Sequence, residues 1–236
     1  MNSDNEASIT LGTPGCATRF RTMLYLACKN GGTDADSCLT NTWASFSGPA
    51  NVCAWDDTAK SYSRALHYYQ DHHALYNTTA AQLLHDADGQ CLCWAELFKE
   101  CLLVNNVANL KKTKVEPYDY YIAFGVKNIA FDDENPTYPE SDPWFYAFND
   151  LDMSATGIAG QNMATPNEKV FGVHWIVRRT DGSTYYDPSY GTTNTGAANF
   201  TANAVAAWEA LVTGAAHWRK VTSSPSVDVT FTDYDW

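Results

Sequence analysis

The sequence lacks any apolar run that approaches the roughly 18 residues of a membrane-spanning helix. It is also poor in basic residues, because 15 Lys and Arg stand against 27 Asp and Glu and the formal net charge is −12. The longest basic cluster, residues 110–114, contains only three lysines. Nucleic-acid-binding proteins normally present a basic surface. We therefore expect neither a nucleic-acid partner nor a membrane span.

A hydrophobic secretion signal is also missing, since residues 2–15 are polar. We expect either a cytoplasmic protein or one from which a signal sequence has been removed. Cysteine is absent from the second half of the chain and occurs at seven positions in the first. These are Cys16, Cys28, Cys38, Cys53, Cys91, Cys93 and Cys101.

The cysteine count leaves two interpretations open. If one cysteine is a nucleophile, the other six could form three disulfides, which favours a secreted or extracytoplasmic protein. Buried free thiols in a cytoplasmic protein are the alternative. Cys93 and Cys101 cannot bond to each other on one helix, because eight residues span about 12 Å. The spacing of Cys91 and Cys93 is unlike a zinc site, and we expect no metal and no cofactor.

The residues present suit a packed globular protein, with 45% hydrophobic and 14% aromatic side chains. Apolar spacing and turn residues predict an α+β fold, with helices first and mostly strands later. Helices are expected over residues 18–29, 36–46, 78–85, 90–104 and 199–212. Strands are expected over residues 51–55, 118–124 and 227–231, and in a hairpin around residues 181–182.

One stretch, residues 88–98, places a cysteine at the start of a helix. Apolar residues recur from Cys91 to Leu102 at the spacing of a single helix face. Asp88 is a candidate N-cap, and Gly89 allows a tight turn into the helix. Cys91 would then lie in the first turn, where free backbone N–H groups and the helix dipole favour an anion. Such a position favours a thiolate nucleophile and could also hold an oxyanion.

A base for this thiol is predicted from the hairpin. Two β-rich runs flank Asp181-Gly182, a strong signature of a two-residue turn. In the register that this turn imposes, Ile176 pairs with Asp187, and His174 becomes a diagonal neighbour of Asp187 on the same face. Diagonal positions lie roughly 7–8 Å apart, within reach of a side-chain hydrogen bond. His217 has no carboxylate placed in this way, so we prefer His174 as the base.

Together these motifs resemble the transglutaminase-like superfamily, which belongs with the papain-like thiol enzymes. The motifs are Gly89-Gln90-Cys91 at the start of an apolar helix, a histidine on a strand, and Asp187-Pro188 after a hairpin. The resemblance implies a triad of Cys91, His174 and Asp187. It also implies a papain-like core in which a central helix carries the nucleophile against an antiparallel sheet. Many members have a Trp one residue further from the histidine than Trp175.

The resemblance extends over roughly residues 79–191. We expect a catalytic core over residues 78–236 and a helical, cysteine-containing cap over residues 1–77. The backbone N–H of Cys91 is the first expected oxyanion donor. By resemblance, Gln90 and Trp55 are candidates for a second donor, and Trp175 is a candidate for binding substrate.

Residues 132–150 form a long acidic segment rich in proline and aromatic side chains. Long loops in compact domains are often functional, so we predict that this segment forms a wall of the substrate cleft. A solvated acidic loop is the alternative. By resemblance, the acidic residues 132–134 could bind calcium, as in some relatives, although carboxylates without a binding-loop signature are usually only solvated.

These features predict a thiol enzyme that acts on amide bonds of proteins or peptides. Attack by Cys91 would leave a thioester, and water would then complete hydrolysis by a cysteine peptidase or deamidase. We expect hydrolysis, since no feature of the sequence protects a thioester from water. Transfer to an amine, as in a protein-glutamine transamidase, is one alternative. A non-catalytic binding or assembly module is the other.

Overall fold

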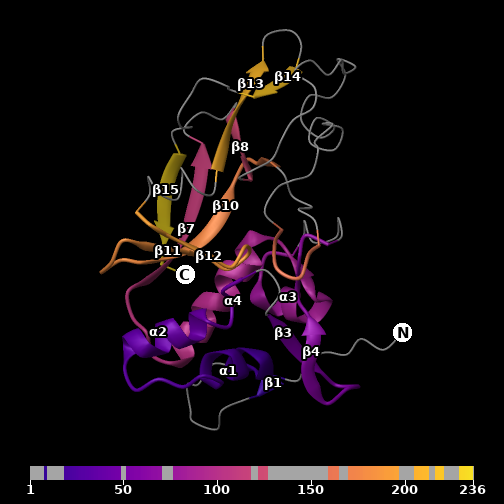
Figure 1. The fold of residues 1–236 in the computed structure, drawn as a ribbon, viewed down its shortest axis with the longest axis vertical. Helices are drawn as coiled ribbons and strands as arrows, with labels where there is room; N and C mark the ends of the chain where they lie inside the picture. The colour runs from indigo at the N-terminus through magenta and orange to yellow at the C-terminus, as the bar shows by residue number, and fades with distance from the viewer. Residues whose placement is uncertain are drawn as a thin grey trace.

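The computed structural model describes residues 8–9, 19–48, 52–70, 77–117, 122–126, 159–164, 170–196, 205–212, 216–220 and 229–235. In this part of the chain, four helices and several small, mostly antiparallel sheets form a mixed α+β fold (Figure 1). The α+β class predicted from the sequence is confirmed. The acidic segment over residues 132–150 and Cys16 lie outside the described residues.

The four helices lie where the sequence predicts them. They are α1 (Arg21–Cys28), α2 (Ala35–Trp43), α3 (Ala80–Asp86) and α4 (Cys91–Val104). Two of them begin with a capping box, formed by Asp34 with Ser37 at α2 and by Thr79 with Gln82 at α3. Each box satisfies backbone N–H groups that a helix start leaves without partners. Local sequence therefore fixes where α2 and α3 begin.

Five antiparallel strands form the main sheet, in the order β12-β11-β10-β7-β15. Their bounds are β7 (Leu110–Pro117), β10 (His174–Arg179), β11 (Thr184–Asp187), β12 (Thr192–Thr195) and β15 (Val229–Tyr234). In the β10–β11 hairpin, Val177 pairs with Tyr186 and Arg178 with Tyr185. This is the register that a two-residue turn at Asp181-Gly182 imposes, so the predicted register is confirmed.

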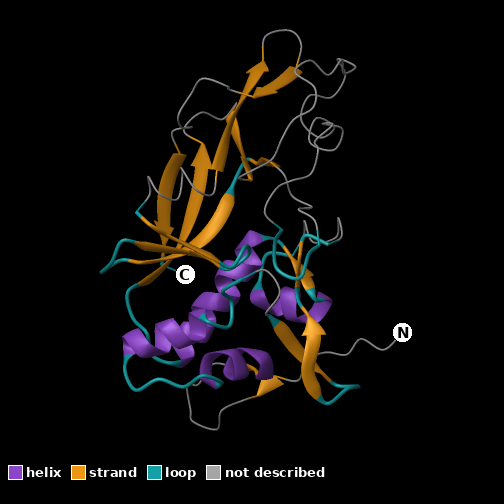
Figure 2. Ribbon diagram, in the orientation of Figure 1, coloured by secondary structure: helices purple, strands orange, loops and turns teal. Residues whose placement is uncertain are grey.

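α4 is the central helix and contacts α1, α2 and α3 as well as strands β7 and β10. Figure 2 shows the helices gathered at one end of the molecule and the main sheet beyond them. Phe98 of α4 lies 5.2 Å from Trp43 of α2 and 5.6 Å from Tyr186 of β11, measured between ring centroids. Buried residues of the N-terminal helices and of α4 belong to one hydrophobic cluster. The division at residues 77 and 78 stays a prediction.

Strand β7 lies inside the main sheet although its sequence contains three lysines. Each lysine has an acidic partner, because Lys111 pairs with Asp235, Lys112 with Glu96, and Lys114 with Glu116. The Lys112 nitrogen lies 3.8 Å from the Glu96 carboxylate, and its side chain is only 3% exposed. A buried amino group requires such compensation. The three lysines of residues 110–114 are therefore paired within the protein and belong to the main sheet.

A second sheet has the order β14-β13-β8-β9. Its strands are β8 (Ile122–Val126), β9 (Val170–Phe171), β13 (Val205–Val212) and β14 (Ala216–Lys220). The helix predicted over residues 199–212 is wrong where the structure describes it, because β13 pairs with β8 on one side and β14 on the other. Strand pairing has overridden the helix preference of the alanines.

Three two-stranded sheets complete the described chain. They are β1 (Ser8–Ile9) with β2 (Arg19–Phe20), β3 (Cys53–Asp56) with β4 (Ser61–Ala65), and β5 (His67–Tyr68) with β6 (Asp88–Gly89). The β5–β6 pair is parallel and leads directly into α4. Within the described ranges, none of the helices is long and apolar enough to cross a membrane.

Candidate active site

Cys91 is the first residue of α4, in the first helical turn as predicted. The N-cap is Gln90, with extended backbone angles of φ −82° and ψ 176°, and its side chain does not cap the helix. Asp88, predicted as the cap, lies instead in β6, where its carboxylate accepts a hydrogen bond from the backbone of Gln70. The first turn of α4 therefore presents backbone N–H groups at Cys91 without a capping side chain between them and the site.

Asn77 fastens the segment that leads into α4. Its Nδ2 donates to Asp86 Oδ2 and to the carbonyl of Asp88, both at 2.9 Å. Its own carbonyl accepts from the Cys93 thiol at 2.6 Å. Gly89 packs closely in the same place, since an added Cβ would lie 3.1 Å from Cys93 Sγ. These contacts fix the chain immediately before Cys91.

His174 and Asp187 form the hydrogen-bonded pair that the hairpin register predicts. His174 Nε2 lies 2.7 Å from Asp187 Oδ2, and the two side chains are 3% and 2% exposed. The second carboxylate oxygen, Oδ1, accepts from the backbone N–H of Ser189 at 3.1 Å. Asp187 is thus held from two directions. A carboxylate oriented in this way selects one orientation of the imidazole ring.

Cys91 and His174 interact across the junction of α4 and β10. Burial alone would lower the pKa of His174, but the charge of Asp187, the Cys91 thiol and the hydrogen bonds to both raise that pKa to about 10. Because Nε2 faces Asp187, Nδ1 is the ring nitrogen that remains for the thiol. Protonated His174 beside Cys91 favours a thiolate–imidazolium pair. The three predicted triad residues therefore lie together.

Two other described cysteines, Cys93 and Cys53, lie in a different setting. Cys93 is fully buried, and its burial raises the pKa of its thiol well above the ordinary value. Burial also raises the pKa of Cys53. Buried thiols of this kind stay protonated and unreactive. Cys91, by contrast with Cys93 and Cys53, interacts with an imidazole.

Every described cysteine is a free thiol. Three disulfides among the six remaining cysteines would require five of these residues, so that arrangement is not present in the structure. The structure favours the alternative of free thiols, several of them buried. The location of the protein stays a prediction.

The other residues predicted for the site lie in different parts of the structure. Trp55 lies on β3, donates its indole N–H to Asp57 at 2.8 Å, and stacks against Arg21 at 4.5 Å. Its donor is therefore used elsewhere, and a role for Trp55 at an oxyanion gains no support. Trp175 follows His174 on β10 and packs 5.1 Å from the ring of Tyr234. The rival base, His217, lies on β14 in the second sheet.

Two residues beside the triad were not singled out by the sequence. Tyr190 places its ring 5.8 Å from that of His174 and 5.1 Å from that of Tyr68. Gln161 is fully buried and bonds to the turn that follows Asp187. Neither belongs to a periodic pattern or a short motif, and residues 157–166 show only the composition of a turn. Their positions follow from tertiary contacts alone.

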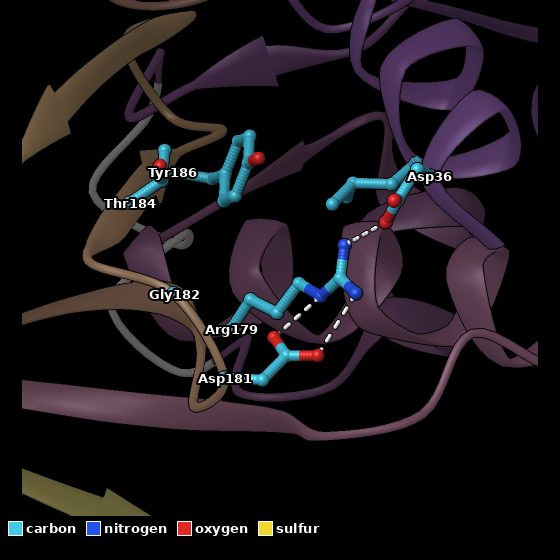
Figure 3. A pocket seen from close by; sticks show the side chains of 7 residues that line it. Asp36, Arg179, Asp181, Gly182, Thr184 and Tyr186 are labelled. Atoms are coloured by element: carbon cyan, nitrogen blue, oxygen red, sulfur yellow. Dashed lines mark hydrogen bonds and ion pairs between the residues drawn. The ribbon is translucent and has the colours of Figure 1, made fainter.

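A cavity of about 240 Å³ lies at the turn of the β10–β11 hairpin, away from the strand end that carries His174 (Figure 3). Its charged groups satisfy one another, because Arg179 bonds to Asp181 through Nε at 2.6 Å and also pairs with Asp36. Tyr186 and Thr184 complete part of the wall. None of the triad residues lines this cavity, so it is separate from the candidate catalytic centre.

The described residues contain no candidate metal site. No cluster of three or more His, Cys, Asp or Glu side chains is arranged there to hold a metal ion. The residues at the triad suit acid–base and nucleophilic chemistry by side chains alone.

The chain matches no model of a known protein family, no curated protein and no solved structure.

Proposed function

We propose that the chain is a thiol-dependent enzyme that acts on amide bonds of proteins or peptides through a thioester on Cys91, with hydrolysis as the outcome. The observation that carries this proposal is the arrangement of three side chains. Cys91 at a helix start contacts His174, which Asp187 orients through a 2.7 Å hydrogen bond. Covalent acyl transfer requires a nucleophile, a base that contacts it and a carboxylate that orients the base.

The first half of the reaction follows from this geometry. The Cys91 thiolate attacks the amide carbon, a C–S bond forms, and the carbonyl electron pair moves onto oxygen. The backbone N–H of Cys91, at the start of α4, is the natural donor to that oxyanion. When the tetrahedral intermediate collapses, the C–N bond breaks and His174 gives its proton to the leaving amine.

The second half returns the thiol. His174, now neutral, removes a proton from water while the water oxygen attacks the thioester carbon. Collapse of this second intermediate breaks the C–S bond and restores the thiolate beside protonated His174. Asp187 keeps the imidazole in the same orientation for both proton transfers.

The same motifs resemble the transglutaminase-like superfamily, and a central α4 packed on an antiparallel sheet accords with that resemblance. Within this proposal, the N-terminal helices act as a cap over α4. Gln90 remains a candidate second oxyanion donor because it directly precedes Cys91. Transamidation differs from hydrolysis only in the acceptor that attacks the thioester, so it is separated by experiment.

The test uses a mixture of peptides with glutamine and asparagine side chains and varied backbone sequences. Mass spectrometry reads cleavage and side-chain deamidation, and a fluorescent primary amine in a parallel reaction reads transamidation. Cys28→Ala is the matched control for Cys91→Ala, since Cys28 is an exposed thiol at the end of α1. We expect cleavage or deamidation that Cys91→Ala abolishes and Cys28→Ala leaves intact. Turnover that persists in Cys91→Ala would contradict the proposal.

A further inference from the structure

The turn that follows Asp187 is bound from behind by Gln161. The side-chain Nε2 of Gln161 donates to the carbonyl of Pro188 at 3.2 Å, and its backbone N–H donates to the carbonyl of Ser189 at 2.9 Å. Gln161 is 0% exposed. One residue from a distant segment thus holds the two residues that come directly after the orienting carboxylate.

The hydrogen bonds from Gln161 hold a part of the chain that pairing between β10 and β11 does not reach. The paired residues of β10 and β11 end at Val177 with Tyr186, one residue short of Asp187. On its other side, Asp187 pairs with Thr192 of β12. The ladder to the strand that carries His174 therefore does not extend to the carboxylate, and its distance from the imidazole depends on the turn.

The same glutamine ties the turn to two other parts of the molecule. Its Nε2 also donates to the carbonyl of Phe46 at 2.6 Å, and its carbonyl accepts from the backbone of Tyr68 at 3.1 Å. Phe46 follows α2, and Tyr68 belongs to β5, the strand that pairs with β6 just before Cys91. Gln161 therefore connects the segment before the nucleophile with the turn after the carboxylate.

A contribution to stability alone does not explain why the Gln161 side chain is buried. Both amide hydrogens of Gln161 are used, but its Oε1 has no hydrogen-bond partner among the described residues. A buried amide oxygen without a partner costs stability. Proteins retain such costs mostly where function requires a defined geometry.

We propose that Gln161 is a positioning residue that sets the distance between Asp187 and His174. Its hydrogen bonds run to neither the thiol nor the imidazole, and it acts through the backbone of Pro188 and Ser189. Its effect on turnover rests on the proposed function of the triad, whereas its effect on His174 does not. A displacement of about 1 Å at an orienting group can cost roughly 100-fold in rate.

The adjacent residue offers a matched control. Asn162 is also bound to two distant carbonyls, since its Nδ2 donates to Val52 at 2.8 Å and to Leu66 at 2.7 Å. These bonds lead to the β3–β4 region and not to the turn after Asp187. Asn162 has a positive φ of 55°, so Asn162→Gly removes the side-chain bonds without adding backbone strain. Gln161→Met removes two donors while keeping the length of the side chain.

The experiment follows the titration of the His174 imidazole by NMR in the unmodified protein, Gln161→Met and Asn162→Gly. The groups that face this imidazole are Asp187 from β11 and Cys91 from α4, with the Tyr190 ring beside them. We expect Gln161→Met to lower the pKa of His174 by about 1 and to slow alkylation of Cys91 at pH 6 by roughly tenfold. Asn162→Gly should lose similar stability and leave both readouts unchanged.

Two results would overturn the proposal. In one, His174 titrates in Gln161→Met as it does in the unmodified protein. In the other, Asn162→Gly shifts the titration as far, which would indicate general loosening. If Gln161→Met does not fold, the shorter Gln161→Asn makes the same comparison, because it moves the donors away from Pro188. A shifted titration with no enzymatic turnover in any variant would sustain the positioning role and count against the proposed function alone.

Discussion

His174 and Asp187 meet through one hydrogen bond, 2.7 Å from Nε2 to Oδ2, although they are 13 positions apart in the chain. The hairpin register brings them together, and both side chains are almost fully buried. This bond commits Nε2 to the carboxylate, which leaves Nδ1 as the ring nitrogen available to the Cys91 thiol. The chemistry proposed for Cys91 depends on this single contact.

Replacing the carboxylate by an amide should weaken the base. In Asp187→Asn, we expect the pKa of His174 to fall because the negative charge beside Nε2 is lost, and we expect activity to fall roughly 10²- to 10⁴-fold. NMR titration of the imidazole and steady-state kinetics measure the two effects. Asp181→Asn, at the turn of the same hairpin, is the control and should change neither. An Asp187→Asn protein with unaltered titration would show that the bond does not tune His174.

The raised pKa of His174 also predicts how stability depends on pH. The pKa is about 10 in the folded protein and about 6.5 in an unfolded chain. Between these values the folded state binds the extra proton, so the stabilisation is fully present below about pH 6.5 and is lost as pH rises through about 10. The free energy of unfolding in urea should therefore fall more steeply with pH than in His174→Gln. Parallel curves for the two proteins would contradict this prediction.

A methyl group added at Gly89 should disturb the segment before the nucleophile. A Cβ there would lie 3.1 Å from Cys93 Sγ and 3.2 Å from Leu83, so Gly89→Ala should cost about 1–3 kcal/mol of stability. At Gly182 a Cβ would meet no atom within 4 Å, and Gly182→Ala is the matched control. Thermal and urea denaturation measure both. Equal stability of the two variants would show that Gly89 is not closely packed.

The cysteines should react as free thiols. Alkylation in denaturant without any reductant should modify all six described cysteines, because the structure contains each of them as a thiol. Peptide mapping of the alkylated protein identifies the sites. Cysteines that become reactive only after reduction would contradict the structure and favour an extracytoplasmic protein.

The elements set by local sequence could be predicted. α2 and α3 begin at capping boxes, α4 follows apolar spacing, and the hairpin follows its Asp-Gly turn. The register expected from Asp181-Gly182 is the one observed, and it brings His174 to Asp187. For these parts, neighbouring residues contain the information that determines the structure.

The rest depends on contacts between distant segments. The alanines of β13 predict a helix, but the segment is a strand because it pairs with β8 and β14. The sequence of β7 resembles a basic cluster because two of its three acidic partners, Glu96 and Asp235, lie elsewhere in the chain. Asn77-Thr78-Thr79 fits the Asn-X-Thr pattern of a glycosylation site, yet the structure buries the Asn77 amide in hydrogen bonds that fix the start of α4. Hydrogen bonds from side chains to distant backbone carbonyls produce no periodic pattern in the sequence, so they could not be predicted from it.

The most direct test of an activated thiol at Cys91 is alkylation of the native protein by iodoacetamide across pH, read by peptide mapping. Cys28 is an internal standard, because it is an exposed free thiol, whereas Cys91 is only 4% exposed. Exposure alone would make Cys91 the slower of the two. The triad predicts that Cys91 reacts faster than Cys28 well below pH 8, and that His174→Ala removes this advantage. If Cys91 reacts no faster than Cys28 at any pH, the thiol is not activated and the proposed enzyme chemistry fails.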